Sequence, residues 1–107
     1  MAKYLISASY TAEGAKGLMK DGGTKRRQAA DQAIKSAGAK LDAFYFAFGE
    51  NDAVVIIDAP DHATVAAASV AINASGAVHS RTTVLLTPEE IDQAVKKTVS
   101  YRAPGQS

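Results

Sequence analysis

The chain has 107 residues, a length typical of one domain, with 47% apolar residues and a formal net charge of +1. The low charge argues against a general electrostatic attraction to nucleic acid or anionic lipid. The absence of cysteine excludes disulfides and thiolate metal sites. No apolar run reaches the length of a signal-peptide core or a transmembrane helix, so we expect a soluble, cytoplasmic protein, bacterial in style.

The first third of the chain predicts one strand followed by an interrupted helix. Apolar residues alternate over Lys3–Tyr10, which is the period of a strand. Helical spacing follows over residues 12–20, is broken at Gly22-Gly23, and resumes behind Thr24 as the expected N-cap. Gly38 stands where a left-handed glycine ends a helix, so the second helical segment is expected to end at Ala37.

The segment from Phe44 to Ala59 predicts a β-hairpin. Phe44, Phe46 and Phe48 alternate with smaller or more polar residues, and aromatic and β-branched residues suit a pleated surface. We expect strands over residues 41–48 and 53–59, joined by a loop of about four residues in which Gly49 can take positive φ at no steric cost and Asp52 supplies turn chemistry. The second strand is apolar on both faces apart from Asp58, which indicates burial on both sides.

The last third of the chain predicts a helix, a strand and a final helix. Asp61 is the expected N-cap of a helix that ends at Ala74, and residues 78–86 alternate as a strand. Thr87, Pro88 and Glu90 form the pattern of a capping box with proline at the first helical position. We expect residues 1–98 to form a single domain and residues 99–107 a C-terminal tail.

The resulting order, βαββαβ with a C-terminal helix, is that of the α+β ferredoxin-like fold with a four-stranded antiparallel sheet. Helices would cover one sheet face, while Tyr45, Val54 and Ile56 would leave the other apolar and open to water. Two apolar faces in so small a chain predict a partner, and two such sheets packed face to face would form a dimeric α+β barrel. Exposed edges at the second and fourth strands would allow larger assemblies.

Two stretches, GENDAVVIIDAPD and GAVHSRTTVLLTPEE, together with the alanine-rich helix between them, resemble the GYD domain family over about residues 3–98. The family signature is a Gly, Tyr and Asp in the hairpin. Gly49 and Asp52 match this signature, but Asn51 stands where the Tyr is expected. The resemblance implies a ferredoxin-like fold and self-association, with no established biochemical activity. The wider group of dimeric α+β barrels includes cofactor-independent monooxygenases, haem-degrading enzymes and small-ligand-binding regulatory domains, an analogy of fold alone.

Five residues are candidate ligand contacts. His79 and Arg81 share one face of the predicted fourth strand, where an arginine suits a carboxylate and a histidine polarises a carbonyl. Tyr10 and Tyr45, and beside them Tyr4, combine apolar rings with polar tips that suit a pocket. The alternative for all of them is a structural role in the core or at a dimer seam.

Other polar residues have simpler interpretations. Asp58 interrupts an apolar run and needs a partner, for which Arg81 is a candidate. His62 lacks the spacing of a metal ligand set, so we expect no metal site, no cofactor and a solvated histidine. The basic run Lys25-Arg26-Arg27 is either a solvated helix face or a phosphate- or RNA-binding patch.

The sequence leaves two main functions open. The first is a homo-oligomeric module for assembly or small-ligand binding, because two apolar sheet faces occur without a catalytic motif. The second is a small cofactor-independent enzyme of monooxygenase or isomerase type, with His79, Arg81 and the tyrosines in a pocket between sheet and helices. An RNA-binding role for the basic run is a third, for which the net charge gives little support.

Overall fold

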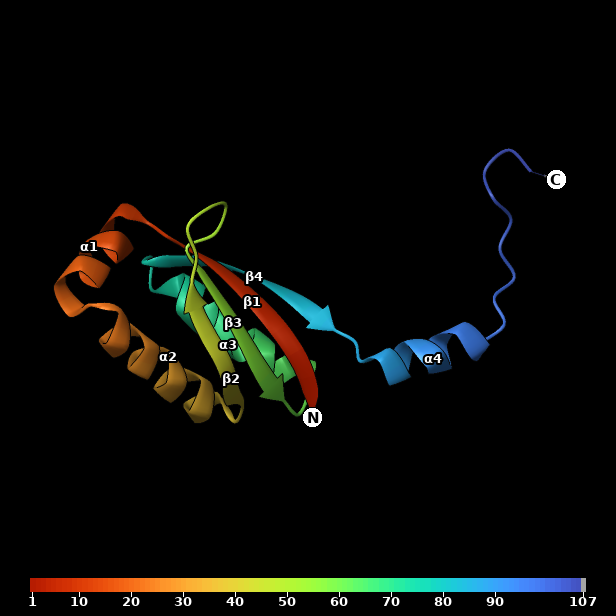
Figure 1. The fold of residues 1–107 in the computed structure, drawn as a ribbon, viewed down its shortest axis with the longest axis horizontal. Coiled ribbons are helices and arrows are strands. Elements are labelled where there is room, and N and C mark those ends of the chain that lie inside the picture. The colour runs from red at the N-terminus through yellow and green to blue at the C-terminus, as the bar shows by residue number, and fades with distance from the viewer. Residues whose placement is uncertain (107) are drawn as a thin grey trace.

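The computed structural model describes residues 1–106, which form one antiparallel sheet and four helices (Figure 1). The elements in chain order are β1 (Ala2–Tyr10), α1 (Ala12–Asp21), α2 (Gly23–Ala37), β2 (Lys40–Phe46), β3 (Ala53–Ala59), α3 (His62–Ala74), β4 (Val78–Leu85) and α4 (Pro88–Lys96). The strand order is β2-β3-β1-β4, and every neighbouring pair is antiparallel. This is the ferredoxin-like arrangement, so the predicted fold class is confirmed, with β2 and β4 at the edges.

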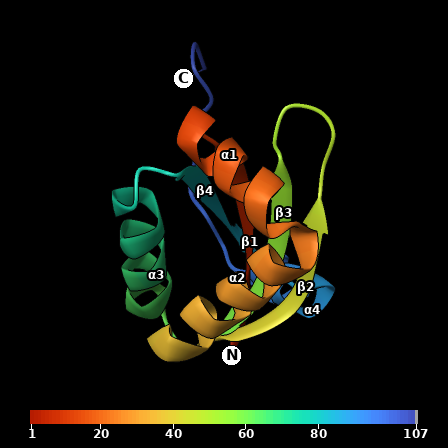
Figure 2. The ribbon, with the colours of Figure 1, turned by 90° about the vertical axis from the view of Figure 1, so that its left-hand side faces the viewer.

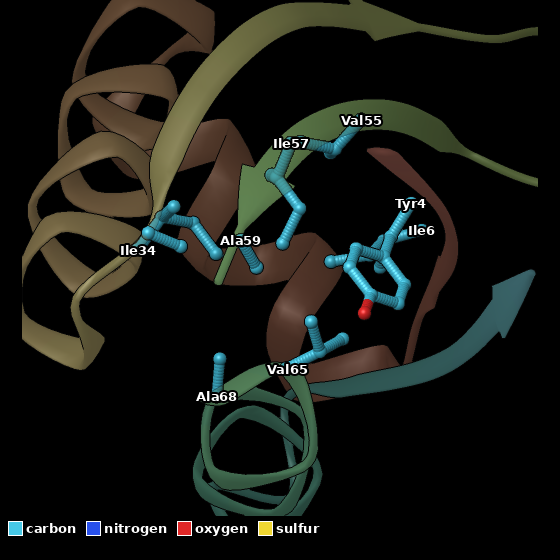
Figure 3. Packing of buried hydrophobic residues seen from close by; sticks show 9 residues of the cluster. Tyr4, Ile6, Ile34, Val55, Ile57, Ala59, Val65 and Ala68 are labelled. Carbon is cyan, nitrogen blue, oxygen red and sulfur yellow. The ribbon is translucent and has the colours of Figure 1, made fainter. Parts of the chain in front are cut away.

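The core lies between one face of the sheet and the helices α2 and α3, and Figure 2 shows α1 on the same side of the sheet as these two helices. Alternate residues of the two central strands supply the sheet side of this core, in β1 Tyr4 and Ile6 and in β3 Val55, Ile57 and Ala59. Ile34 of α2 and Val65 and Ala68 of α3 close over them (Figure 3). The period-two pattern read from the sequence therefore assigns this face correctly.

The break between α1 and α2 occurs at Gly22, which has a φ of 81°. Its N–H donates to the Leu18 carbonyl at 2.8 Å, and its carbonyl accepts from the Arg26 N–H at 3.3 Å. One glycine thus ends the first helix and begins the second, so the prediction of Thr24 as N-cap is wrong. Gly38 does adopt the predicted left-handed conformation, with a φ of 97°.

The hairpin loop is longer than predicted, because β2 ends at Phe46 and residues 47–52 precede β3. Phe48 is therefore fully exposed in the loop, outside the strand assigned to it. Gly49 does not have positive φ, since the longer loop contains no tight two-residue turn. Asp52 ties the end of the loop to β1: its N–H donates to the Ala8 carbonyl at 2.8 Å, and its carboxylate accepts from the Tyr10 N–H at 2.8 Å.

The caps of the last two helices are confirmed. The Asp61 carboxylate accepts from the Thr64 N–H at 2.8 Å, and Thr87 and Glu90 form the reciprocal capping box. The amphipathic helix α4 extends away from the sheet and helices (Figure 1). The radius of gyration is accordingly 17.3 Å, against about 13 Å expected for a compact chain of this length.

Candidate functional site

The first candidate site is the sheet face that carries no helix, which we call the open face. At its centre lie Leu5 of β1 and Val54 and Ile56 of β3, all partly exposed. Tyr45 of β2 extends this surface and is 71% exposed. Within a single chain, β3 is therefore buried on one side only. The predicted burial of β3 on both sides would require a partner.

One end of the open face carries an ion cluster of Lys3, Asp42 and Asp58. The Lys3 Nζ donates to both carboxylates, at 3.0 Å to Asp58. The hydrogen bond from Lys3 lowers the pKa of Asp42, and the same hydrogen bond is the main cause of the raised pKa of Lys3. The predicted partner of Asp58, Arg81, is wrong because β1 lies between β3 and β4 and supplies Lys3 instead.

The other end of the open face carries His79 and Arg81. They pair in register with Ser9 and Ser7 of β1, and both are exposed. Together with Glu50 and Asn51 from the hairpin loop they line a pocket. Asn51, at the position of the family's tyrosine, therefore lies beside two of the predicted ligand residues.

The second candidate site is a cavity of about 130 Å³ on the opposite side of the sheet, between the strands, α2 and α3. Its lining is mostly apolar and comes from every strand and from both helices: Ile6, Ala8, Tyr10, Arg26, Ala29, Ala30, Ala33, Ile34, Phe44, Ala53, Val55, Ile72, Val78 and Ser80. Tyr10 is the one predicted ligand residue found here. His79 and Arg81 lie on the other face, so the predicted enzyme pocket that combines them with Tyr10 is not formed within the chain.

Arg26 is the charged residue of this cavity lining, and sequence reasoning placed it only in a basic run. Arg26 turns toward the cavity, whereas Lys25 and Arg27 are exposed, so the three cations do not form one patch. A signal for this arrangement was present in the sequence. Arg26, Ala30 and Ala33 recur at helical spacing and therefore share one face of α2.

Two further findings concern the other polar candidates. The Nδ1 of His62 lies 2.7 Å from the hydroxyl of the buried Tyr4, so this histidine is tied to the core rather than merely solvated. Within residues 1–106, no three His, Asp or Glu side chains gather in a way that could hold a metal ion. In the same residues, no helix is both long and apolar enough to span a membrane.

Comparison with known proteins gives a family and a fold. A family model described as the GYD domain matches residues 4–95. No curated protein matches the chain. Among solved structures, the crystal structure of MtbAldR is similar, with 19% identity and a TM-score of 0.55. The match covers 96% of this chain but only 57% of MtbAldR, and at this identity it supports the ferredoxin-like fold alone.

Proposed function

This chain belongs to the GYD domain family, and we propose that it acts as a homo-oligomeric α+β module whose protomers pack open face against open face. A two-fold arrangement of this kind would be a dimeric α+β barrel, in which the two sheets enclose a second core. The assembly would be the functional unit, and the fold of each protomer would serve to present the open face.

The observation that carries this proposal is the apolar centre of the open face. Leu5 lies opposite Ile56 across the hydrogen-bonded pair β1–β3, Val54 follows on the same face of β3, and Tyr45 of β2 lies opposite Val54. Contiguous apolar surface on a small protein marks an interaction site, and a self-complementary patch favours a second copy of the same chain.

Helix α4 gives independent support. Ile91 and Val95 lie one helical turn apart on α4 and are both exposed, Val95 at 77%. A helix of nine residues is marginal in water without tertiary contacts. Only Leu86 and Thr87 connect β4 to α4, and the helix continues outward from the sheet edge (Figure 1). Its apolar side would therefore gain a contact from a neighbouring protomer.

The proposal is tested by native mass spectrometry and light scattering of the purified chain. We expect a multiple of the 11.1 kDa protomer for the wild type and a shift toward monomer for Ile56→Asp, which places a charge at the centre of the open face. Val70→Asp is the matched control, because Val70 is exposed on α3 on the other side of the sheet. A monodisperse wild-type monomer at micromolar concentration would refute the proposal, as would equal effects of both variants.

Small-ligand binding is the second candidate, favoured by the cavity between the helices and the sheet. Its polar groups are Arg26, Tyr10 and Ser80, and the Ser80 hydroxyl already lies 3.2 Å from the Asn73 side chain. This set lacks a paired acid and base, so it supports binding better than catalysis. Cofactor-independent catalysis would need a reacting group supplied by the substrate or by a second protomer.

A further inference from the structure

The cavity exists because α2 presents alanine where larger side chains would fill the space. Ala29, Ala30 and Ala33 form its helical wall, opposite Ile6 and Val55 of the central strands. Protein interiors normally reach close packing, and longer aliphatic side chains on this helix face would close the gap. An apolar, alanine-walled space of this kind is suited to an apolar group from a ligand.

The size of the cavity limits the ligand. A volume of about 130 Å³ is slightly below the ~150 Å³ of an engineered apolar cavity that accepts benzene. One aromatic ring or a branched chain of similar volume is therefore the largest apolar group that we expect this space to enclose. The aromatic ring of Phe44 and the side chain of Ile72 provide apolar walls from β2 and α3.

The charge of the cavity defines the polar part of the ligand. Arg26 is partly buried, lines the cavity, and makes no ion pair with any side chain in residues 1–106. The first turn of α2 contains no acidic residue, so no carboxylate of this turn competes for Arg26. A partly desolvated guanidinium without a carboxylate partner favours an anion, and its planar fork matches a carboxylate.

We propose that this cavity binds a small apolar carboxylate, with its ring or branched chain among the alanines of α2 and its carboxylate on Arg26. The proposal rests on the second candidate function, ligand binding, and does not depend on assembly, because all the lining residues belong to one chain. Tyr10 lines the same space, and its hydroxyl is the hydrogen-bond donor that we propose as a second contact for the carboxylate.

The test uses benzoate as the probe, titrated into the full chain by calorimetry and by amide chemical-shift mapping. We expect saturable binding with shifts centred on α2, β1 and β4. Arg26→Gln should weaken binding at least about tenfold, the factor that corresponds to one charged hydrogen bond. Arg27→Gln is the matched control, since it removes the neighbouring, exposed cation and should leave the affinity nearly unchanged.

Two further measurements separate the possible failures. Ala30→Leu fills the cavity while keeping Arg26, and it should abolish binding of benzoate if the ring occupies the space among the alanines. Benzyl alcohol, a neutral probe of the same size, should bind more weakly than benzoate. Equal binding of the two probes, unaffected by Arg26→Gln, would overturn the carboxylate assignment while ligand binding stood. Binding of neither probe to the wild type would overturn both.

Discussion

The two faces of the sheet are built from the same strands and from similar residues, yet only one of them is covered. On the helix side, Ile57 is fully buried and Tyr4 and Ile6 nearly so. On the open face, their sequence neighbours Ile56 and Leu5 are partly exposed. The difference lies in what packs on each face, because residue type alone would bury both.

The two faces also differ in the polar and charged residues that they carry. The helix side contains no buried polar or charged residue within the described part of the chain. The open face has an ion cluster at one end and the His79–Arg81 pair at the other, around an apolar centre. An apolar centre with a polar rim is the anatomy of an interface, which is why a second copy of the chain is the occupant that we propose.

The largest expected effect comes from comparing two adjacent isoleucines on opposite faces. Ile57→Ala should lower the free energy of unfolding by about 2–5 kcal/mol, the cost of truncating a fully buried isoleucine. Ile56→Ala should cost less in dilute protein, and its effect should grow with protein concentration if a second chain covers the open face as we propose. Urea denaturation at two protein concentrations measures both. Equal, concentration-independent losses would show that the faces do not differ in this way.

A second comparison addresses how tightly the helix side is closed. A Cβ added at Gly14 of α1 would lie 2.0 Å from the Ala77 carbonyl oxygen, whereas one added at Gly17 meets nothing within 4 Å. Gly14→Ala should therefore destabilise the protein by roughly 1–3 kcal/mol through displacement of α1. Gly17→Ala should instead stabilise it by about 0.5–1 kcal/mol through helix propensity. Thermal unfolding followed by circular dichroism gives the sign of each effect. Stabilisation by both variants would mean that α1 packs loosely.

Local sequence signals predicted most of the fold, because the features that define it are short-range. The alternation in β1, the glycine at Gly38 and the capping box at Thr87 each depend on a few neighbouring residues. The errors arose where two local signals competed. Thr24 is a good N-cap residue, but Gly22 already closes α1 and begins α2. The apolar Phe48 extended the predicted strand, although the ladder ends at Phe46.

The candidate sites were harder to predict because they depend on which strands are neighbours. The sequence paired Asp58 with Arg81. In the structure β1 lies between β3 and β4, so the partner of Asp58 is Lys3 of β1. Tyr10 and His79 lie on opposite faces, a separation that follows from register and cannot be read from either strand alone. A pocket between sheet and helices was predicted, but its alanine wall and Arg26 were missed because alanine gives no chemical signal, and only the spacing of Arg26 with the α2 alanines points to them.

The smallest expected effect is a pH dependence that differs between the two sides of the sheet. Hydrogen bonds from the Thr64 N–H and hydroxyl lower the pKa of Asp61, the N-cap of α3 on the helix side. A carboxyl with a lowered pKa stabilises the fold above its unfolded-state pKa, and this contribution is lost as the pH falls through the folded-state pKa. The Asp61→Asn variant keeps a good N-cap residue, and this residue does not titrate. Below about pH 4, the melting temperature of this variant should therefore fall less than that of the wild type.

Asp42→Asn provides the matching measurement for the open face, where Lys3 lowers the pKa of the carboxyl. The contribution of Asp42 to stability is lost over the same acidic range. The Lys3–Asp42 ion pair is solvent-exposed, so salt should weaken it, whereas salt should not weaken the short-range hydrogen bonds of the Asp61 cap. Melting curves from neutral pH to about pH 2, at low and high salt, separate the two. A salt-sensitive Asp61 contribution, or a salt-insensitive one at Asp42, would contradict this assignment. The expected result would show that hydrogen bonds of a helix cap stabilise the helix side, whereas an ion pair that salt can screen stabilises the end of the open face.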